Sequence, residues 1–349
     1  MKVTQKQVKN ISKKFAAVFV LPLLIYLILM FISLRNPSNV YNIFSGATIK
    51  SILVEASYVT IVALGIGFQL KYGRFDFAGG AIIVVSAVVG GLLADKMIGV
   101  GAATGWPLLM VTCILVAVAL SVINASVYVW LKIPISVCSL ALAFLFEAIP
   151  GLLLGTKPGP EIQFATGYNV LGKTYLVLLP LAIAVIIYIV YDKFTVVGRH
   201  SRLLANNQLS AVNIGINEKK NTIYAYIVSG ILFGLAGAIY ATKNRLAPVE
   251  APLATTGTLF ANIIPSLVGL FLSRWIDDSA GTFIGAITIQ ILYYGLGILG
   301  VKFGGLKLFY AGFLAVFIFI SGFWDKIILF LRNLYKKVMQ KLAPKVKSQ

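Results

Sequence analysis

Residues 222–241 read Thr-Ile-Tyr-Ala-Tyr-Ile-Val-Ser-Gly-Ile-Leu-Phe-Gly-Leu-Ala-Gly-Ala-Ile-Tyr-Ala and contain no Asp, Glu, Lys, Arg or His. A helix needs about 20 apolar residues to cross the hydrocarbon core of a bilayer. This stretch has that length, and charged residues stand only at its borders, with Lys219 and Lys220 before it and Lys243 after it. The stretch therefore predicts a transmembrane helix.

Similar apolar runs fill most of the chain on both sides of this stretch. Hydrophobic residues make up 59% of the 349 residues and charged residues 12%, whereas a soluble globular protein is about 45–50% apolar and about 25% charged. The sequence thus predicts an all-α integral membrane protein with about ten transmembrane helices. The runs cover residues 15–34, 49–70, 77–94, 108–131, 135–155, 174–191, 222–241, 254–272, 280–300 and 306–324.

The formal net charge of +19 is concentrated at the two ends of the chain and between the apolar runs. Cytoplasmic segments of membrane proteins carry an excess of Lys and Arg. We therefore expect basic cytoplasmic tails at 1–14 and 325–349, a membrane domain at 15–324 and a cytoplasmic segment at 192–221 within it. Cations in these places do not form the basic groove or recognition helix of a nucleic-acid-binding protein, so we expect no nucleic acid partner.

Patterns typical of enzymes and metal sites lack the context that they need. Gly295–Gly300 satisfies the spacing of a dinucleotide-binding loop, but it ends an apolar run, and Lys302 is not part of a Gly-Lys-Ser/Thr triplet. His200 has no nucleophile or acid at a useful spacing, and Cys113 and Cys138 lie inside apolar runs. We expect neither an enzyme nor a metal site, and no ATPase site of the chain's own.

Polar and helix-breaking residues inside the runs are candidates for a transport pathway. A charge at the centre of a bilayer costs at least about 2.5–3.5 kcal/mol, so Glu55 and Glu147 either line a pathway or lie near an interface where they reach water. Pro150, Pro180 and Pro265 predict broken or kinked spans, which are tolerated where protein or a water-filled cavity satisfies the backbone. The candidate pathway residues are Glu55, Asp76, Glu147, Asn262 and Pro265.

Pairs of glycines four residues apart allow helix backbones to approach closely. Such pairs occur at Gly151/Gly155, Gly230/Gly234 and Gly281/Gly285. We interpret them as sites of helix packing within the chain rather than as a dedicated face for a dimer.

The cytoplasmic segment 192–221 contains a short polar stretch that begins near Asn207 and ends at Gly215. Asn is a preferred first cap of a helix and Gly a preferred last one, so the stretch predicts a short helix between two spans. Such a helix is either a contact point for another protein or part of an ordinary solvated loop.

Several of these residues resemble a known family, the permease subunits of ABC importers for ribose, galactose, xylose and related solutes, a type that includes branched-chain amino acid permeases. The stretch Gly73-Arg-Phe-Asp-Phe-Ala-Gly-Gly80 and the stretch Asn39-Val-Tyr-Asn-Ile43 are similar to motifs of that family. The resemblance extends from about residue 38 to 325. In the cytoplasmic segment and the span after it, the matching residues are Gly198, Arg199, Asn207, Gly215, Ile216, Gly230, Leu235, Ala236 and Gly237.

The resemblance implies a permease in the bacterial cytoplasmic membrane that moves a small polar solute, with a sugar favoured over a nucleoside or branched-chain amino acid. It also implies ATPase subunits that bind ATP and Mg²⁺, an extracytoplasmic solute-binding protein and a second permease in the membrane. A secondary transporter is the remaining alternative. In an ABC permease, the segment that couples to the ATPase would use Gly198, Arg199, Asn207, Gln208, Gly215, Ile216 and Asn217.

The chain departs from the family pattern at Gln208, Leu209 and Ser210, where an acidic residue and two alanines are usual, and at Arg74, which replaces a glycine. One hypothesis is that the chain is half of a heterodimer whose partner keeps the standard residues.

Overall fold

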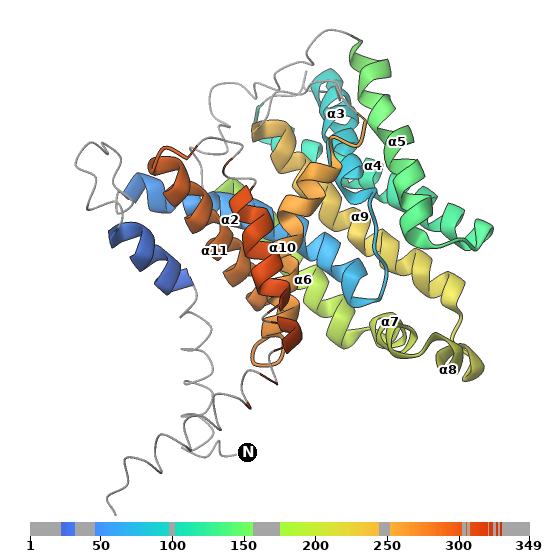
Figure 1. Cartoon of the computed structure of the whole chain (residues 1–349). Helices are drawn as coiled ribbons and strands as arrows, with labels where there is room; N and C mark the ends of the chain where they lie inside the picture. Colours follow the sequence, from blue (N-terminus) through green and yellow to red (C-terminus); the bar gives the residue numbers. More distant parts are fainter. Residues whose placement is uncertain are drawn as a thin grey trace, which may run out of the picture. The chain divides into compact units, whose positions relative to one another are not determined.

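A computed structural model describes residues 22–31, 46–97, 102–155, 175–243 and 252–301, together with residues 305, 308–319, 321–323, 326 and 329. Within these ranges the regular structure is entirely helical, without a strand, which confirms the all-α fold (Figure 1). The residues up to Leu299 form one compact unit and those from Gly300 onward a second.

Ten labelled α-helices and one π-helix, η2, make up most of the first unit (Figure 1). They are α2 (Gly46–Lys71), α3 (Gly79–Met97), α4 (Ala102–Leu131), α5 (Ile135–Leu154), α6 (Tyr175–Ile189), η2 (Val190–Phe194), α7 (Val196–Asn206), α8 (Gln208–Asn213), α9 (Glu218–Lys243), α10 (Thr256–Leu272) and α11 (Asp278–Ile298). Shorter apolar helices also cover Pro22–Phe31 and Leu308–Phe323.

The described part of each apolar run lies on these helices, and the run 174–191 continues from α6 into η2. Among the described residues, six helices are long and apolar enough to cross a membrane. The remaining runs lie on shorter apolar helices, at Pro22–Phe31, Gly79–Ala94, Leu259–Leu272 and Leu308–Phe323. The chain is therefore a multi-pass membrane protein. The predicted tail at 1–14 lies outside the described residues, as does that at 325–349 except for residues 326 and 329.

The most buried helices are α2 and α9. In their most apolar windows, 83% of the residues of α2 and 78% of those of α9 are buried, against 33% along α6 and η2. Helix α9 packs most extensively on α4 and also contacts α2, α3 and α6. The long helices α2 and α9 are thus the centre of the bundle, and α5 and α6 direct much of their surface outward.

Glycines on α9 allow this close packing. A Cβ atom at Gly230 would lie 2.8 Å from the Cα atom of Val118 on α4, and one at Gly234 would overlap the backbone of Ile114. The prediction of packing within the chain is confirmed for this pair. It is also confirmed for Gly281 and Gly285, which face α10.

The third pair of glycines behaves differently. A Cβ atom at Gly151 or Gly155 would meet no described atom within 4 Å. The prediction of packing within the chain is therefore wrong for this pair, as far as the described residues show. No described helix covers this end of α5, where Leu152 and Leu153 between the two glycines are exposed as well.

The bundle is interrupted at two places that lie close together. Residues 72–78 separate α2 from α3, and Gly65 and Gly79 both face the ring of Phe233, so the chain turns back before α3 begins. The turn at 252–255 precedes α10, and its Thr255 carbonyl lies against Gly80 at the start of α3. The N-termini of two helices thus meet inside the protein.

These interruptions do not fall at the prolines. Pro150, Pro180 and Pro265 lie inside α5, α6 and α10, each of which continues through its proline. Of the predicted broken or kinked spans, breaks at these residues are therefore wrong, and kinks stay a prediction. The neighbouring helices supply enough contacts for the helix to continue past a missing backbone N–H, as is common in membrane helices.

We predict that Gly234→Val destabilises the protein by about 3 kcal/mol or more, because the new side chain overlaps the backbone of α4, which cannot rotate away. Gly151→Val is the matched control, since it makes the same change inside a helix but faces open space. Thermal unfolding in detergent measures both. Equal melting temperatures for the two variants would contradict the assigned α4–α9 interface.

Candidate functional site

Two short helices, α7 and α8, follow α6 and precede α9, and in Figure 1 they lie beyond the ends of these long helices. Helix α7 begins at Thr195, whose hydroxyl oxygen accepts a hydrogen bond of 3.0 Å from the N–H of Gly198. A Cβ atom at Gly198 would overlap the carbonyl of Tyr191 in η2. The glycine therefore lets α7 pack directly on η2, a π-helix of the kind that is frequent at functional sites.

Helix α8 has the boundaries that its sequence predicts. The side chain of Asn207 accepts a hydrogen bond of 3.0 Å from the N–H of Ser210. Gly215 ends the helix at φ +91°, and the N–H of Ile216 donates to Ala211, which completes a Schellman motif. The short helix between Asn207 and Gly215 is confirmed. The preceding helix α7 was not predicted.

Three apolar side chains on α8 and at its C-terminal cap are exposed, among exposed polar neighbours. Leu209 is 78% exposed and Ile214 72% exposed, and Val212 lies between them. We call these three residues the α8 surface. Ile216 instead packs inward against Leu204. Large exposed apolar side chains on a helix that is too short and polar to span a membrane are typical of a protein contact.

Of the remaining residues of the predicted coupling segment, Arg199 and Gln208 are exposed. The amide of Gln208 donates to Glu218 at 2.7 Å. Asn217 caps α9, because its side-chain oxygen accepts from the N–H of Lys220 at 3.0 Å. The segment is thus built of capped elements with defined contacts, and the coupling role of its predicted residues stays a prediction.

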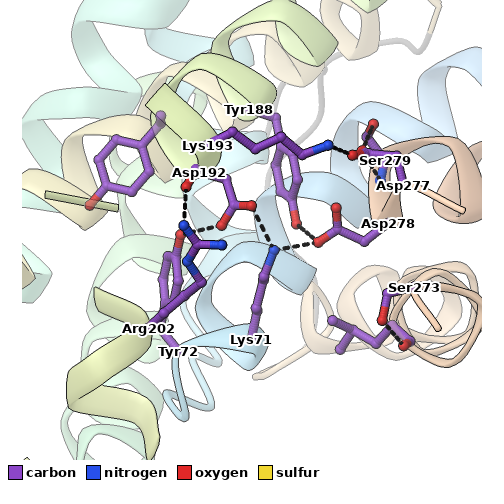
Figure 2. A network of polar contacts seen from close by, with 12 residues as sticks. Lys71, Tyr72, Tyr188, Asp192, Lys193, Arg202, Ser273, Asp277, Asp278 and Ser279 are labelled. Atoms are coloured by element: carbon purple, nitrogen blue, oxygen red, sulfur yellow. Dashed lines mark hydrogen bonds and ion pairs between the residues drawn. The ribbon is translucent and has the colours of Figure 1, made fainter. Parts of the chain in front are cut away.

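A network of ion pairs and hydrogen bonds lies beside α7 (Figure 2). The ammonium of Lys71, in the last turn of α2, lies 3.0 Å from the carboxylate of Asp192 in η2 and 2.6 Å from that of Asp278 at the start of α11. Tyr188 donates to Asp278 at 2.8 Å, and Tyr72 donates to Asp192 at 3.0 Å. We call these five residues the Lys71 network.

Two further contacts extend the network. The guanidinium of Arg202 in α7 donates to the carbonyl of Asp192 at 3.0 Å, and Lys193 pairs with Asp277.

Burial and the carboxylate of Asp192 raise the pKa of the Tyr72 hydroxyl above its ordinary value. Tyr72 therefore remains protonated, and its hydroxyl can donate the hydrogen bond to Asp192.

The candidate pathway residue Glu147 has a clear structural role. It is buried on α5, and its carboxylate accepts hydrogen bonds from the N–H of Leu253 at 2.6 Å and of Thr255 at 2.8 Å, as well as from the Thr255 hydroxyl. These donors belong to the turn before α10, where Leu253 adopts φ +58°. Glu147 thus holds the start of α10.

The other two candidate carboxylates have partners of their own. Glu55 pairs with Lys243 at the end of α9. Asp76 accepts from the N–H of Ala78 and from the amide of Asn124, and so caps α3. Each of the three carboxylates thus holds a different pair of chain segments.

The last two candidates lie on α10. Asn262 is buried there, and the backbone of Pro265 packs against Gly285 of α11. A role of any of the five residues in a pathway stays a prediction.

Sequence reasoning missed the Lys71 network and the α8 surface. Asp192, Asp277 and Asp278 are among only 11 acidic residues, and they border spans on the side that is rich in Lys and Arg. Acidic residues there are a usable signal, because they need cationic partners nearby.

We predict that Glu147→Ala destabilises the protein by about 2–5 kcal/mol, because two buried N–H groups lose their acceptor at about 1–3 kcal/mol each. Glu55→Ala should cost less, since the side chain of its partner Lys243 is 26% exposed and can reach water. Thermal unfolding in detergent compares them. Glu55→Ala melting at or below the temperature of Glu147→Ala would contradict the prediction.

Comparison with known proteins identifies relatives over most of the chain. Residues 48–321 match the family described as "Branched-chain amino acid transport system / permease component". The ribose import permease protein of Bacillus subtilis is 26% identical over 284 residues, which are 80% of this chain and 84% of that protein.

Two further relatives come from Escherichia coli. The D-allose transport system permease protein is 26% identical over 263 residues, covering 73% of this chain and 77% of that protein. The galactose/methyl galactoside import permease protein is 23% identical over 289 residues, covering 78% and 82%. With its family match over most of its length, this chain belongs to the branched-chain amino acid transport system permease component family.

Proposed function

We propose that this chain is the membrane-spanning permease subunit of an ABC importer in the bacterial cytoplasmic membrane. The single observation that carries the proposal is the α8 surface, an exposed apolar patch on a capped helix between two long membrane helices, in a chain of this family. ATPase subunits would bind this surface from the cytoplasm. They, and not this chain, would bind ATP and Mg²⁺ and hydrolyse the nucleotide.

The proposed orientation follows from charge. Lys132, Arg199, Lys219 and Lys220 belong to segments that we assign to the same side as α8, and such cations favour the cytoplasm. With about ten crossings, both termini are then cytoplasmic as well. An ATPase in the cytoplasm could reach α8 only in this orientation.

The proposed solute is a sugar. The relatives described above are named for the import of ribose and galactose and for the transport of D-allose. An extracytoplasmic binding protein would deliver the sugar to a pathway formed with a second permease, either another copy of this chain or a paralogue. A Cβ atom at Gly151 or Gly155 would meet no described atom within 4 Å, which is compatible with a membrane partner at the end of α5.

An ion-gradient mechanism has less support. A secondary transporter that moves protons or ions needs ionisable groups that are able to exchange them. Glu147 instead accepts three hydrogen bonds from a turn that it holds, and Glu55 is paired with Lys243. Both carboxylates therefore make structural contacts that a change of protonation would disturb.

Reconstitution tests the function. The chain is purified with the ATPase and binding protein encoded beside it, and uptake of radiolabelled ribose, allose and galactose into proteoliposomes is measured with and without internal ATP. ATP-dependent uptake of one of these sugars is expected. Uptake that needs no ATP but follows an imposed ion gradient would reject the proposal in favour of a secondary transporter.

We predict that Leu209→Asp or Ile214→Asp lowers the affinity for the ATPase at least tenfold, because each places a charge in an apolar contact. Asn213→Asp is the matched control, since it adds the same charge to the same helix outside the α8 surface and should change the affinity less than threefold. Pull-down titration with purified ATPase measures the affinities. Equal losses in all three variants would show that the α8 surface is not the contact.

A further inference from the structure

The Lys71 network joins three helices that meet at one end of the bundle. Its carboxylates are largely removed from solvent, since the side chains of Asp192 and Asp278 are 3% and 7% exposed, and that of Lys71 is 19% exposed. Figure 2 shows the ammonium of Lys71 between the two carboxylates. One lysine therefore connects the end of α2 to η2 on one side and to the start of α11 on the other.

The surroundings make these contacts specific. The ring of Phe68, which is fully buried, packs on the rings of Tyr72 at 4.9 Å and Tyr188 at 5.7 Å between centroids. These are the two tyrosines whose hydroxyl groups donate to the carboxylates. Where little water can enter, removing one partner of an ion pair leaves an uncompensated charge, so the geometry of the network is strongly preferred.

The network is also the main connection between α6 and α11. Direct packing between these two helices is slight, and Asp278 receives both Lys71 and Tyr188. Without the carboxylate of Asp278, the hairpin of α10 and α11 would contact the α6 side chiefly through α2.

The same network reaches α7. Arg202 of α7 donates to the carbonyl of Asp192, and Gly198 packs on the carbonyl of Tyr191, the residue before Asp192. A displacement of α8 would therefore move α7, and α7 would move Asp192. Asp192 would transmit the displacement to Lys71 and so to α2 and α11.

We propose that Lys71 is a positioning residue for transport, which makes the coupling helices α7 and α8 move as one body with α2 and the α10–α11 hairpin. This inference rests on the proposed function, because it assumes that an ATPase moves α8. It goes further by assigning the transmission of that motion to one buried cation and two carboxylates that are 86 residues apart in sequence, at positions 192 and 278.

The test is the number of sugar molecules imported per ATP hydrolysed, measured with the reconstituted importer. Lys71→Met should leave ATP hydrolysis within twofold of wild type and lower uptake at least tenfold. Lys71→Arg should keep at least a third of the uptake, since it retains the charge. Lys50→Met, an exposed lysine at the other end of the same helix, is the matched control and should change neither quantity.

Asp278→Asn should lower uptake as Lys71→Met does, and the double variant should be no worse than either single one, because both changes break the same link. Uptake per ATP equal to wild type in assembled Lys71→Met would overturn the inference. So would a parallel loss of uptake and hydrolysis, since it would place the residue in assembly or docking.

A milder variant covers the case in which Lys71→Met does not assemble. Tyr188→Phe removes only the hydroxyl that donates to Asp278, and uptake per ATP should fall about threefold to fivefold, which corresponds to one hydrogen bond of about 1 kcal/mol. An unchanged ratio would reject the inference. Failure of the wild-type importer to couple uptake to ATP would instead reject the proposed function.

Discussion

Inside a bilayer, each backbone N–H that leaves a helix must find an acceptor within the protein, because no water is available there. This chain leaves its helices at two buried places, and a carboxylate serves each of them. Asp76 accepts the N–H of Ala78 at the start of α3, and Glu147 accepts those of Leu253 and Thr255 before α10. Among the described residues, Asp76, Glu147 and Asp277 thus each accept backbone N–H groups at the start of a helix.

The distance in sequence between a group and its partner explains which predictions succeed. Apolar run length alone predicts where the long helices lie, because each helix depends on its own sequence. The boundaries of α8 follow in the same way from Asn207 and Gly215, since caps are local. Carboxylate partners are not local. Glu147 and Thr255 are 108 residues apart, and Lys71 and Asp278 are 207 apart, so a single sequence gives no signal that they meet.

The errors have the same origin. Prolines suggested breaks at Pro150, Pro180 and Pro265 because proline lacks a donor, but the helices around them continue. The observed breaks occur where Gly79 and Gly80 let two chain segments approach, which depends on the fold around them. Likewise, the pair Gly230/Gly234 and the pair Gly151/Gly155 have the same spacing in sequence. Only the first pair has a neighbouring helix packed on it among the described residues.

The π-helix η2 links the end of α6 to α7 through a fixed number of residues. A π-turn holds one more residue than an α-turn, and each residue of an α-helix turns the chain by about 100°. Deleting Val190 or Tyr191 would place Asp192 on another side of the helix, since consecutive residues of an α-helix are about 100° apart, and its carboxylate would leave Lys71. The number of residues before Asp192 is therefore as constrained as their chemistry.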